Sequence, residues 1–286
     1  MHGVIIRYLM KKLLLFLVII ANAWYAVGAQ QLRSERFVES ALSLGGGYTH
    51  LFDTYLSPQR YSGGHVMLQS ERFGQLAYEN GRWYGQSRLV IHGDYTKPAS
   101  GSGLTIGGMG DYSYTCYYRP LHTNGWSLYM GPQVQLRIGG IYNLRNSNNP
   151  AQLKLGVNLA ASALGKYSFS LWNTPMSVRL QADMPLFGFA FGPDYGQSYY
   201  EIFYLGNAEG CVHMTAPHNN LSLRTGLGYE VQLRSCTMRL TWQEDLYHWR
   251  LGNQQYRMLT HSVMLGYVSN LYHVWRDDEA RQYIPY

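Results

Sequence analysis

The chain of 286 residues has little charge and little cysteine. Asp, Glu, Lys and Arg together make up 14% of the residues. The basic residues form no cluster, which argues against a nucleic acid as partner. Cysteine occurs at Cys116, Cys211 and Cys236. The odd number and the lack of a CxxC pair argue against a disulfide framework and against a metal site.

The apolar run Leu13–Ile20 is too short to cross a bilayer as a helix, which takes about 20 apolar residues. Two lysines precede it, and the small residues Val27-Gly28-Ala29 follow it. A charged start, an apolar middle and small residues before a cut predict a secretory signal peptide over residues 1–29. The alternative is an anchoring helix. Cleavage after Ala29 would leave a mature chain close to neutral.

Tyrosine and period-two alternation are what the chain has in abundance. There are 26 tyrosines, and aromatic residues reach 15%. In the run Pro132–Ile138, Gln133, Gln135 and Arg137 alternate with three aliphatic residues. This alternation predicts a strand with one apolar and one polar face.

Similar segments recur along the chain, separated by turn and loop residues such as Asn124-Gly125 and Gly252-Asn253. They lie at about 40–51, 63–79, 83–95, 103–118, 126–142, 152–170, 176–190, 220–233, 236–251 and 255–271. Many are far longer than the five or six residues of an average soluble strand. The pattern predicts an all-β fold, a closed antiparallel transmembrane barrel of about ten strands. A strand at Tyr199–Leu205 would raise the count, and the alternative is twelve.

The predicted connections alternate between mostly longer and tight ones, as in barrels with long outer loops and short periplasmic turns. The mature domain is therefore predicted to be a barrel over residues 30–271, with a long outer loop at 191–219. The charged segment 272–286 is predicted to be a periplasmic tail. A secreted soluble β-protein would show the same alternation and is the alternative.

Charged residues of the polar faces are predicted to point into a narrow lumen. Buried charges persist only when they are paired, so a network of salt bridges across the lumen is expected. The alternative is a narrow polar passage or a ligand pocket near the outer mouth. The predicted network consists of Arg88, Asp94, Asp111, Arg137, Arg179, Asp183, Arg224, Glu230 and Arg239.

No pattern assigns a catalytic residue, a metal ligand or a cofactor. Barrel lipases pair His with a Ser two residues away, a spacing that no histidine here has. His261-Ser262 are adjacent and so point to opposite faces of a strand. Glu244-Asp245 with His248 has a superficial likeness to the omptin proteases. We interpret these three as strand-end residues. We do not expect His213 and His218 to form a metal site.

The long loop is the predicted carrier of outward function, because loops hold binding residues that a barrel positions. Its aromatic residues either form a surface for a glycan or protein ligand or fold over the barrel mouth as a lid. The residues proposed for binding are Tyr195, Tyr199, Tyr200, Phe203 and Tyr204.

In its signal, its long alternating strands and its Tyr- and Gly-rich composition, the chain resembles small outer-membrane β-barrel proteins of Gram-negative bacteria that carry no assigned activity. The resemblance spans about residues 40–271 and implies a fold and an outer-membrane location, with lipid and the barrel-assembly machinery as partners. We expect a non-enzymatic role in surface binding, envelope organisation or restricted passage of small solutes. The alternative is a barrel enzyme, lipase- or protease-like, acting at the outer rim.

Overall fold

The computed structural model describes residues 38–76, 81–101, 103–146, 150–194, 196–233 and 236–271. The predicted signal peptide, the predicted tail and Tyr195 lie outside these ranges. The strands in these ranges are β1 (Val38–Asp53), β2 (Ser57–Gln75), β3 (Trp83–Pro98), β4 (Thr105–Thr123), β5 (Trp126–Asn143), β6 (Ala151–Leu171), β7 (Thr174–Phe191), β8 (Val212–Thr215), β9 (Leu223–Gln232), β10 (Thr237–Leu251) and β11 (Gln254–Leu271), and a short helix, α2 (Tyr199–Phe203), lies between β7 and β8.

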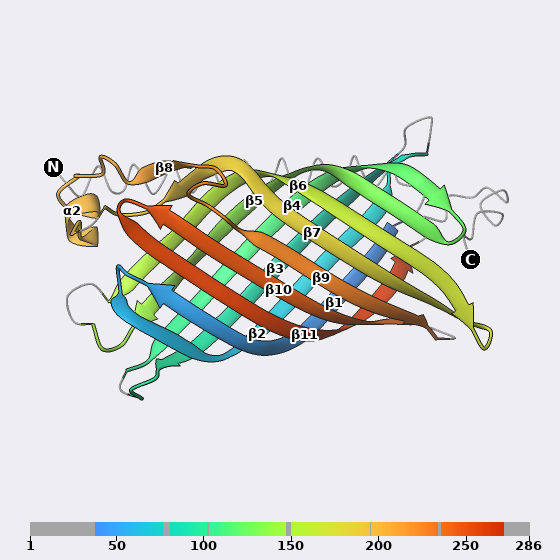
Figure 1. Ribbon diagram of the computed structural model, residues 1–286, viewed down its shortest axis with the longest axis horizontal. Coiled ribbons are helices and arrows are strands. Elements are labelled where there is room, and N and C mark those ends of the chain that lie inside the picture. Colours follow the sequence, from blue (N-terminus) through green and yellow to red (C-terminus); the bar gives the residue numbers. More distant parts are fainter. Residues whose placement is uncertain are drawn as a thin grey trace.

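The strands form a closed antiparallel barrel (Figure 1). Sequential strands pair from β1 to β7, β7 pairs with β9, and β1 pairs with β11 along its whole length. Ten strands build the wall, and the short β8 pairs with the end of β7 beyond the stretch that pairs with β9. The predicted all-β barrel of ten strands is therefore confirmed.

The alternative of twelve strands is wrong, because the stretch that would have supplied another strand is helical. Ser198 caps α2: its hydroxyl accepts a hydrogen bond from the Glu201 amide, and the Glu201 carboxylate accepts one from the Ser198 amide. This reciprocal capping box stabilises a helix start. Within the described residues, no helix is long and apolar enough to cross a membrane.

Several connections are two-residue turns in which the chain takes a left-handed conformation. Asn124 and Gly125 have φ of 46° and 83°, and Gly252 and Asn253 have φ of 54° and 57°. Positive φ at both central positions matches the twist of the two flanking strands, and Asn and Gly adopt it most readily. The residue pairs that signalled turns in the sequence therefore set these hairpins.

The two ends of the barrel differ. We call one end the terminal end, because β1 begins there and β11 ends there. The turns 124–125 and 172–173 lie at the same end. At the other end, the loop end, lie the connections 54–56, 99–104, 144–150, 192–222 and 252–253. The segment 192–222, with α2 and β8, makes the loop end the larger of the two (Figure 1).

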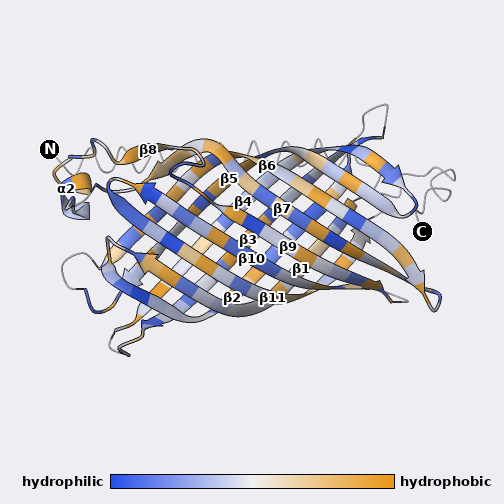
Figure 2. Ribbon diagram, viewed as in Figure 1, coloured by the Kyte–Doolittle hydropathy of each residue, from blue (hydrophilic) through white to orange (hydrophobic). Residues whose placement is uncertain are grey.

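The wall is apolar outside and polar inside. Val66, Ile138 and Leu265 point outward and are 67%, 64% and 57% exposed, whereas inward Gln133 and Asp183 are each 1% exposed. Apolar and polar residues alternate along the strands in Figure 2. A soluble β-barrel turns its apolar side chains inward. This wall has the reverse polarity, which suits lipid outside and argues against the soluble alternative.

Aromatic side chains border the apolar outer face near both ends. Near the terminal end the rings of Trp83 and Tyr118 lie 5.3 Å apart. Tyr48 and Tyr95 are exposed on the same outer face near the loop end. Trp83 and Tyr95 lie on one strand, and the rise and tilt of barrel strands put them about 28 Å apart across the membrane. This span is comparable to the apolar band of about 25 Å that outer-membrane barrels carry.

An arginine in the middle of the outer face should destabilise the barrel. Leu265 faces Leu44 and Leu240 across its two neighbouring strands. We expect Leu265→Arg to lower the free energy of unfolding by about 2–4 kcal/mol, because the charge would lie in hydrocarbon. The measurement is denaturant unfolding in phospholipid vesicles.

The matched control is Leu121→Arg, which places the same residue near the terminal end of β4. It should cost about 0–1 kcal/mol. Equal effects of both substitutions would contradict the assignment of this face to lipid.

Candidate functional site in the barrel lumen

Charged side chains fill the lumen in paired groups. The group nearest the terminal end joins three carboxylates to three basic groups, and β1, β2, β6, β7, β9 and β10 supply them. The Arg179 guanidinium lies 2.7 Å from Glu71, and the Lys166 ammonium 3.2 Å from Glu230. Arg239 contacts all three carboxylates. The group consists of Glu39, Glu71, Lys166, Arg179, Glu230 and Arg239.

Glycine on β9 makes room for this group. A Cβ on Gly228 would lie 2.7 Å from Cγ of Arg179, closer than real side-chain atoms approach. The small residue therefore allows the long arginine to lie across the lumen.

Arg88 and Asp183 form an ion pair in the middle of the lumen. Asp183 also accepts hydrogen bonds from Ser162 at 2.5 Å and from Gln181 at 3.1 Å. The Tyr117 hydroxyl donates to Gln86 at 3.1 Å. Buried charges require such additional donors to offset their loss of water. The network therefore holds this carboxylate as a structural element.

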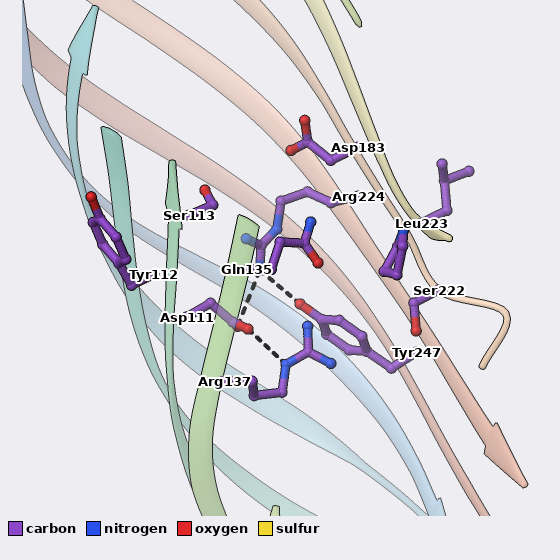
Figure 3. A pocket seen from close by; sticks show the side chains of 11 residues that line it. Asp111, Tyr112, Ser113, Gln135, Arg137, Asp183, Ser222, Leu223, Arg224 and Tyr247 are labelled. Atoms are coloured by element: carbon purple, nitrogen blue, oxygen red, sulfur yellow. Dashed lines mark hydrogen bonds and ion pairs between the residues drawn. The ribbon is translucent and has the colours of Figure 1, made fainter. Parts of the chain in front are cut away.

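A third group lies toward the loop end (Figure 3). Arg137 and Arg224 both point at Asp111, at 2.6 and 3.2 Å. Arg224 also pairs with Asp245 and donates to the Tyr247 hydroxyl at 2.7 Å. The guanidinium of Arg137 lies 3.8 Å from the centre of the Tyr247 ring, within range of a cation–π interaction.

Asp94 belongs to a hydrogen-bonded chain of neutral and charged groups. Its carboxylate lies 2.9 Å from His92 and accepts from Thr49 at 2.8 Å. Thr49 in turn contacts Nδ1 of His65 at 3.0 Å, and Nε2 of His65 lies 2.7 Å from the Ser262 hydroxyl. A serine, a histidine and a carboxylate resemble a hydrolytic triad, but with Thr49 inserted between His65 and Asp94. Ser262 is 0% exposed, however, so no substrate reaches its hydroxyl.

Aromatic and aliphatic side chains close the lumen at the loop end. Trp249, Tyr256 and Leu56 are buried there in one apolar cluster. The Lys154 ammonium pairs with Asp53 at 2.9 Å and lies 3.8 Å from the centre of the Tyr256 ring. The cluster lies between the polar groups of the lumen and the loop-end connections.

Two cavities between the paired groups measure about 10 and 20 Å³. Asp111, Arg137 and Arg224 line the smaller one, and Glu71, Arg179 and Arg239 are among the residues around the larger one. A single water molecule needs about 10–15 Å³ by this measure. These cavities hold a water or so each, far less than a solute requires.

All nine residues predicted from strand parity lie in the lumen, and each has a paired or hydrogen-bonded neighbour there. The structure adds partners that sequence reasoning missed: Glu39, Asp53, Glu71, Lys154, Lys166 and Asp245. Asp245 shares the parity of Arg239 on one strand, so a complete parity count of β10 would have found it. Glu39 lies at the start of its strand, where the alternation is too short to assign a face.

The four predicted outer-loop residues that the structure describes separate into two ring stacks. Tyr199 and Phe203 stack at 5.9 Å, and Phe203 stacks on Phe191 at 6.3 Å. Tyr200 and Tyr204 stack at 4.7 Å on another side of the helix. Tyr199 is tied to the barrel, because its hydroxyl accepts from the Leu153 amide at 2.6 Å.

Tyr55 and Tyr199, which anchor the segment 192–222 to the barrel, are neutral. Burial, and next the nearby carboxylate of Asp53, raise the pKa of Tyr55 to about 12. Burial likewise raises the pKa of Tyr199. The Tyr55 hydroxyl donates to the Gln197 carbonyl at 3.2 Å, and its ring meets that of Tyr199 edge to face. These contacts hold the start of the 192–222 segment against the β1–β2 turn.

The rim residues considered for catalysis do not come together in one site. Glu244 points outward and pairs with His261 at 2.8 Å, whereas Asp245 points into the lumen. His248 points outward, where Arg250 and Arg257 donate to it. His213 contacts the Gly192 carbonyl. In the ranges that the structure describes, no group of three or more His, Cys, Asp or Glu side chains is placed to hold a metal ion.

The fold and the filled lumen define a small, lipid-facing β-barrel of the outer-membrane type. Within that class the chain belongs to the family described as "Protein of unknown function (DUF3316)", whose model matches residues 10–277. No protein with a curated description matches it.

Solved structures with a similar chain path include outer-membrane barrels. The transport unit of the autotransporter AIDA-I from Escherichia coli has 10% identity and a TM-score of 0.46, over 82% of this chain and 89% of that one. The outer membrane protease OmpT from Escherichia coli has 5% identity and a TM-score of 0.41, over 82% and 97%. The translocator domain of the autotransporter NalP from Neisseria meningitidis has 10% identity and a TM-score of 0.38, over 88% and 95%. Similarities at this level carry no argument about activity.

Removing one partner of a buried pair should cost more than removing both. We expect Arg88→Met to lower the free energy of unfolding by about 3–5 kcal/mol, because it leaves the Asp183 carboxylate buried without its cation. The measurement is denaturant unfolding of the refolded barrel.

The control is the double variant Arg88→Met with Asp183→Asn, which has no buried charge left at this position. It should recover a large part of the loss. A double variant less stable than Arg88→Met would contradict the role of this pair as mutually compensating charges.

The capping box of α2 should make the 192–222 segment sensitive to acid. Hydrogen bonds from the Ser198 amide and hydroxyl lower the pKa of Glu201 below its usual value of 4.5. A lowered pKa in the folded state means stabilisation that is present above the unfolded value and lost as the pH falls through the folded value. We expect limited proteolysis of this segment to accelerate below about pH 4.

Glu201→Gln is the matched control, because glutamine supplies a neutral acceptor at the same place. It should remove the pH dependence, whereas Ser198→Ala should accelerate cleavage at neutral pH as well. Unchanged cleavage of Ser198→Ala would argue against the capping box as the stabilising element.

Proposed function

We propose that this protein is a non-enzymatic integral outer-membrane barrel whose lumen does not conduct and whose loop end carries a binding surface. The observation that carries the proposal is the paired filling of the lumen. Arg88, Arg179 and Arg224 each cross it to a carboxylate on a strand that does not pair with their own, and two cavities between the paired groups measure about 10 and 20 Å³. Restricted passage of solutes is the less favoured role for this reason.

The proposed orientation places the loop end at the cell surface. Outer-membrane barrels have short periplasmic turns and longer outer loops. Here the segment 192–222 lies at the loop end, and the two-residue turns 124–125 and 172–173 lie at the terminal end. The barrel-assembly machinery and outer-membrane lipid are the partners that this placement implies.

The proposed binding surface is the exposed face of α2. Tyr200, Phe203 and Tyr204 are 59%, 57% and 55% exposed, and Tyr200 and Tyr204 lie nearly parallel. Tyrosine combines a flat apolar ring with a polar hydroxyl and contributes large contact area at low cost in conformational entropy. Such a surface suits a glycan or a protein ligand. The capping box and Tyr199 hold it in one orientation.

A barrel enzyme is not favoured by any arrangement within the described residues. Ser262 and His65, which reach Asp94 only through Thr49, lie inside the lumen, and Ser262 is fully buried. The outward Glu244 and His261 pair with each other and lack a neighbouring nucleophile in the described ranges.

The lumen should be electrically closed. We expect the purified barrel to give no stable conductance steps in planar bilayers, because charges paired at 2.6–3.2 Å occupy the ion path. Regular steps from the native protein would contradict the proposal.

Insertion is checked separately, because a flat trace could also mean that no barrel entered the bilayer. Protein reconstituted into vesicles of the same lipid should show heat-modifiable migration on a gel, so that a flat trace reports a closed lumen.

A further inference from the structure

Four basic side chains lie on the outer face of the wall near the loop end. They are Arg60 on β2, Lys97 on β3, Arg250 on β10 and Arg257 on β11, and all are exposed. The strand register brings them together, because Phe52 on β1 faces Arg257 on one side and Arg60 on the other. Lys97 faces Ser62, next to Arg60 on the same face. We call these four residues the outer basic patch.

The outer basic patch has no anionic partner among the residues that the structure describes. Arg250 and Arg257 donate to Nε2 of His248, at 3.3 and 3.2 Å, so that imidazole accepts and is neutral. Lys97 lies 5.5 Å from the centre of the Tyr95 ring. The carboxylate on the same face, Glu244, pairs with His261 instead.

The outer basic patch differs from the lumen in how its arginines are paired. Arg88, Arg137, Arg179, Arg224 and Arg239 all pair with carboxylates of the chain itself. An arginine on a lipid-facing wall strongly lowers the free energy of unfolding at the centre of the bilayer and lowers it only slightly near the interface. The outer basic patch therefore leaves its charge for an anion that the membrane interface supplies.

The height of the outer basic patch along the membrane normal matches that of lipid head groups. Tyr48 and Tyr95, which border the apolar face, lie on β1 and β3 two to four residues nearer the membrane centre than Phe52 and Lys97. Interfacial tyrosines lie at the boundary of the head groups. The basic residues beyond them lie at the height of the head groups.

We propose that the outer basic patch binds the phosphate groups of a phosphorylated glycolipid of the outer leaflet. Arginine forms paired, charge-assisted hydrogen bonds with phosphate, and three guanidinium groups spread over β2, β11 and β10 match a head group with more than one phosphate. His50 and Ser62, hydrogen-bonded to each other at 3.0 Å on the same face, add polar groups suited to sugar hydroxyls. The assignment rests on the proposed orientation of the loop end toward the cell surface.

The test is lipid retention on the detergent-purified barrel, measured by native mass spectrometry with bisphosphorylated lipid A as the probe. Each basic group near an anionic surface changes affinity by about fivefold. The variant R60Q/R250Q/R257Q should therefore lose roughly 100-fold in affinity. Lipid A without its phosphates should bind the native barrel as weakly as bisphosphorylated lipid A binds this variant.

The control variant is R72Q/R82Q, which removes two positive charges from the exposed residues near the terminal end. It should retain lipid A as the native barrel does, and heat-modifiable migration on a gel should show that both variants fold. Equal retention by R60Q/R250Q/R257Q and the native barrel would overturn the proposal. Equal affinity for phosphatidylglycerol and lipid A would overturn the assignment to an outer-leaflet glycolipid.

A separate experiment tests the orientation. An epitope inserted between Gly206 and Asn207 should be detected on intact cells by an antibody that does not enter them. Its absence from the surface, with lipid A still bound in detergent, would overturn the proposed orientation while the basic patch remained a phosphate site. Surface detection without lipid A binding would overturn the patch alone.

Discussion

The pairing of β1 with β11 is the contact on which the other features depend. Their register runs from Val38 and Leu271 to Asp53 and Tyr256 without a break. It removes the two sheet edges, whose free amides and carbonyls would each cost several kcal/mol in hydrocarbon. Once the wall is closed, period-two alternation gives every side chain one of two environments, lipid or lumen.

Closure also explains the charge network. A ten-stranded wall leaves a lumen that side chains nearly fill, so its polar residues cannot all be hydrated. Carboxylates and basic groups from several strands then compensate one another, as Arg239 on β10 does with Glu39 on β1, Glu71 on β2 and Glu230 on β9. This need for internal compensation is absent on the outer face, where Arg60, Arg250 and Arg257 lie near the interface. The chain thus pairs its buried arginines and leaves those exposed ones to the surroundings.

Sequence reasoning went furthest where a local pattern decided the outcome. The alternation around Gln133 and Arg137 and the turn at Asn124-Gly125 predicted strands and hairpins, because side-chain direction and positive φ are properties of neighbouring residues. The alternative of a further strand at Tyr199–Leu205 was wrong. The Ser198–Glu201 capping box and the contact of Tyr199 with Leu153 favoured a helix there.

The sequence by itself determined the period-two strands, the two faces of the wall and the inward direction of residues such as Arg88 and Asp183, whereas the choice of ten strands over twelve came from the structure. Only the tertiary structure decided that Arg88 and Asp183 meet, since they lie on β3 and β7, which do not pair, and approach across the lumen. It also decided that Arg60, Arg250 and Arg257 form one patch. Alternation depends on residues next to each other in the chain, whereas these contacts depend on the closed circumference of the barrel.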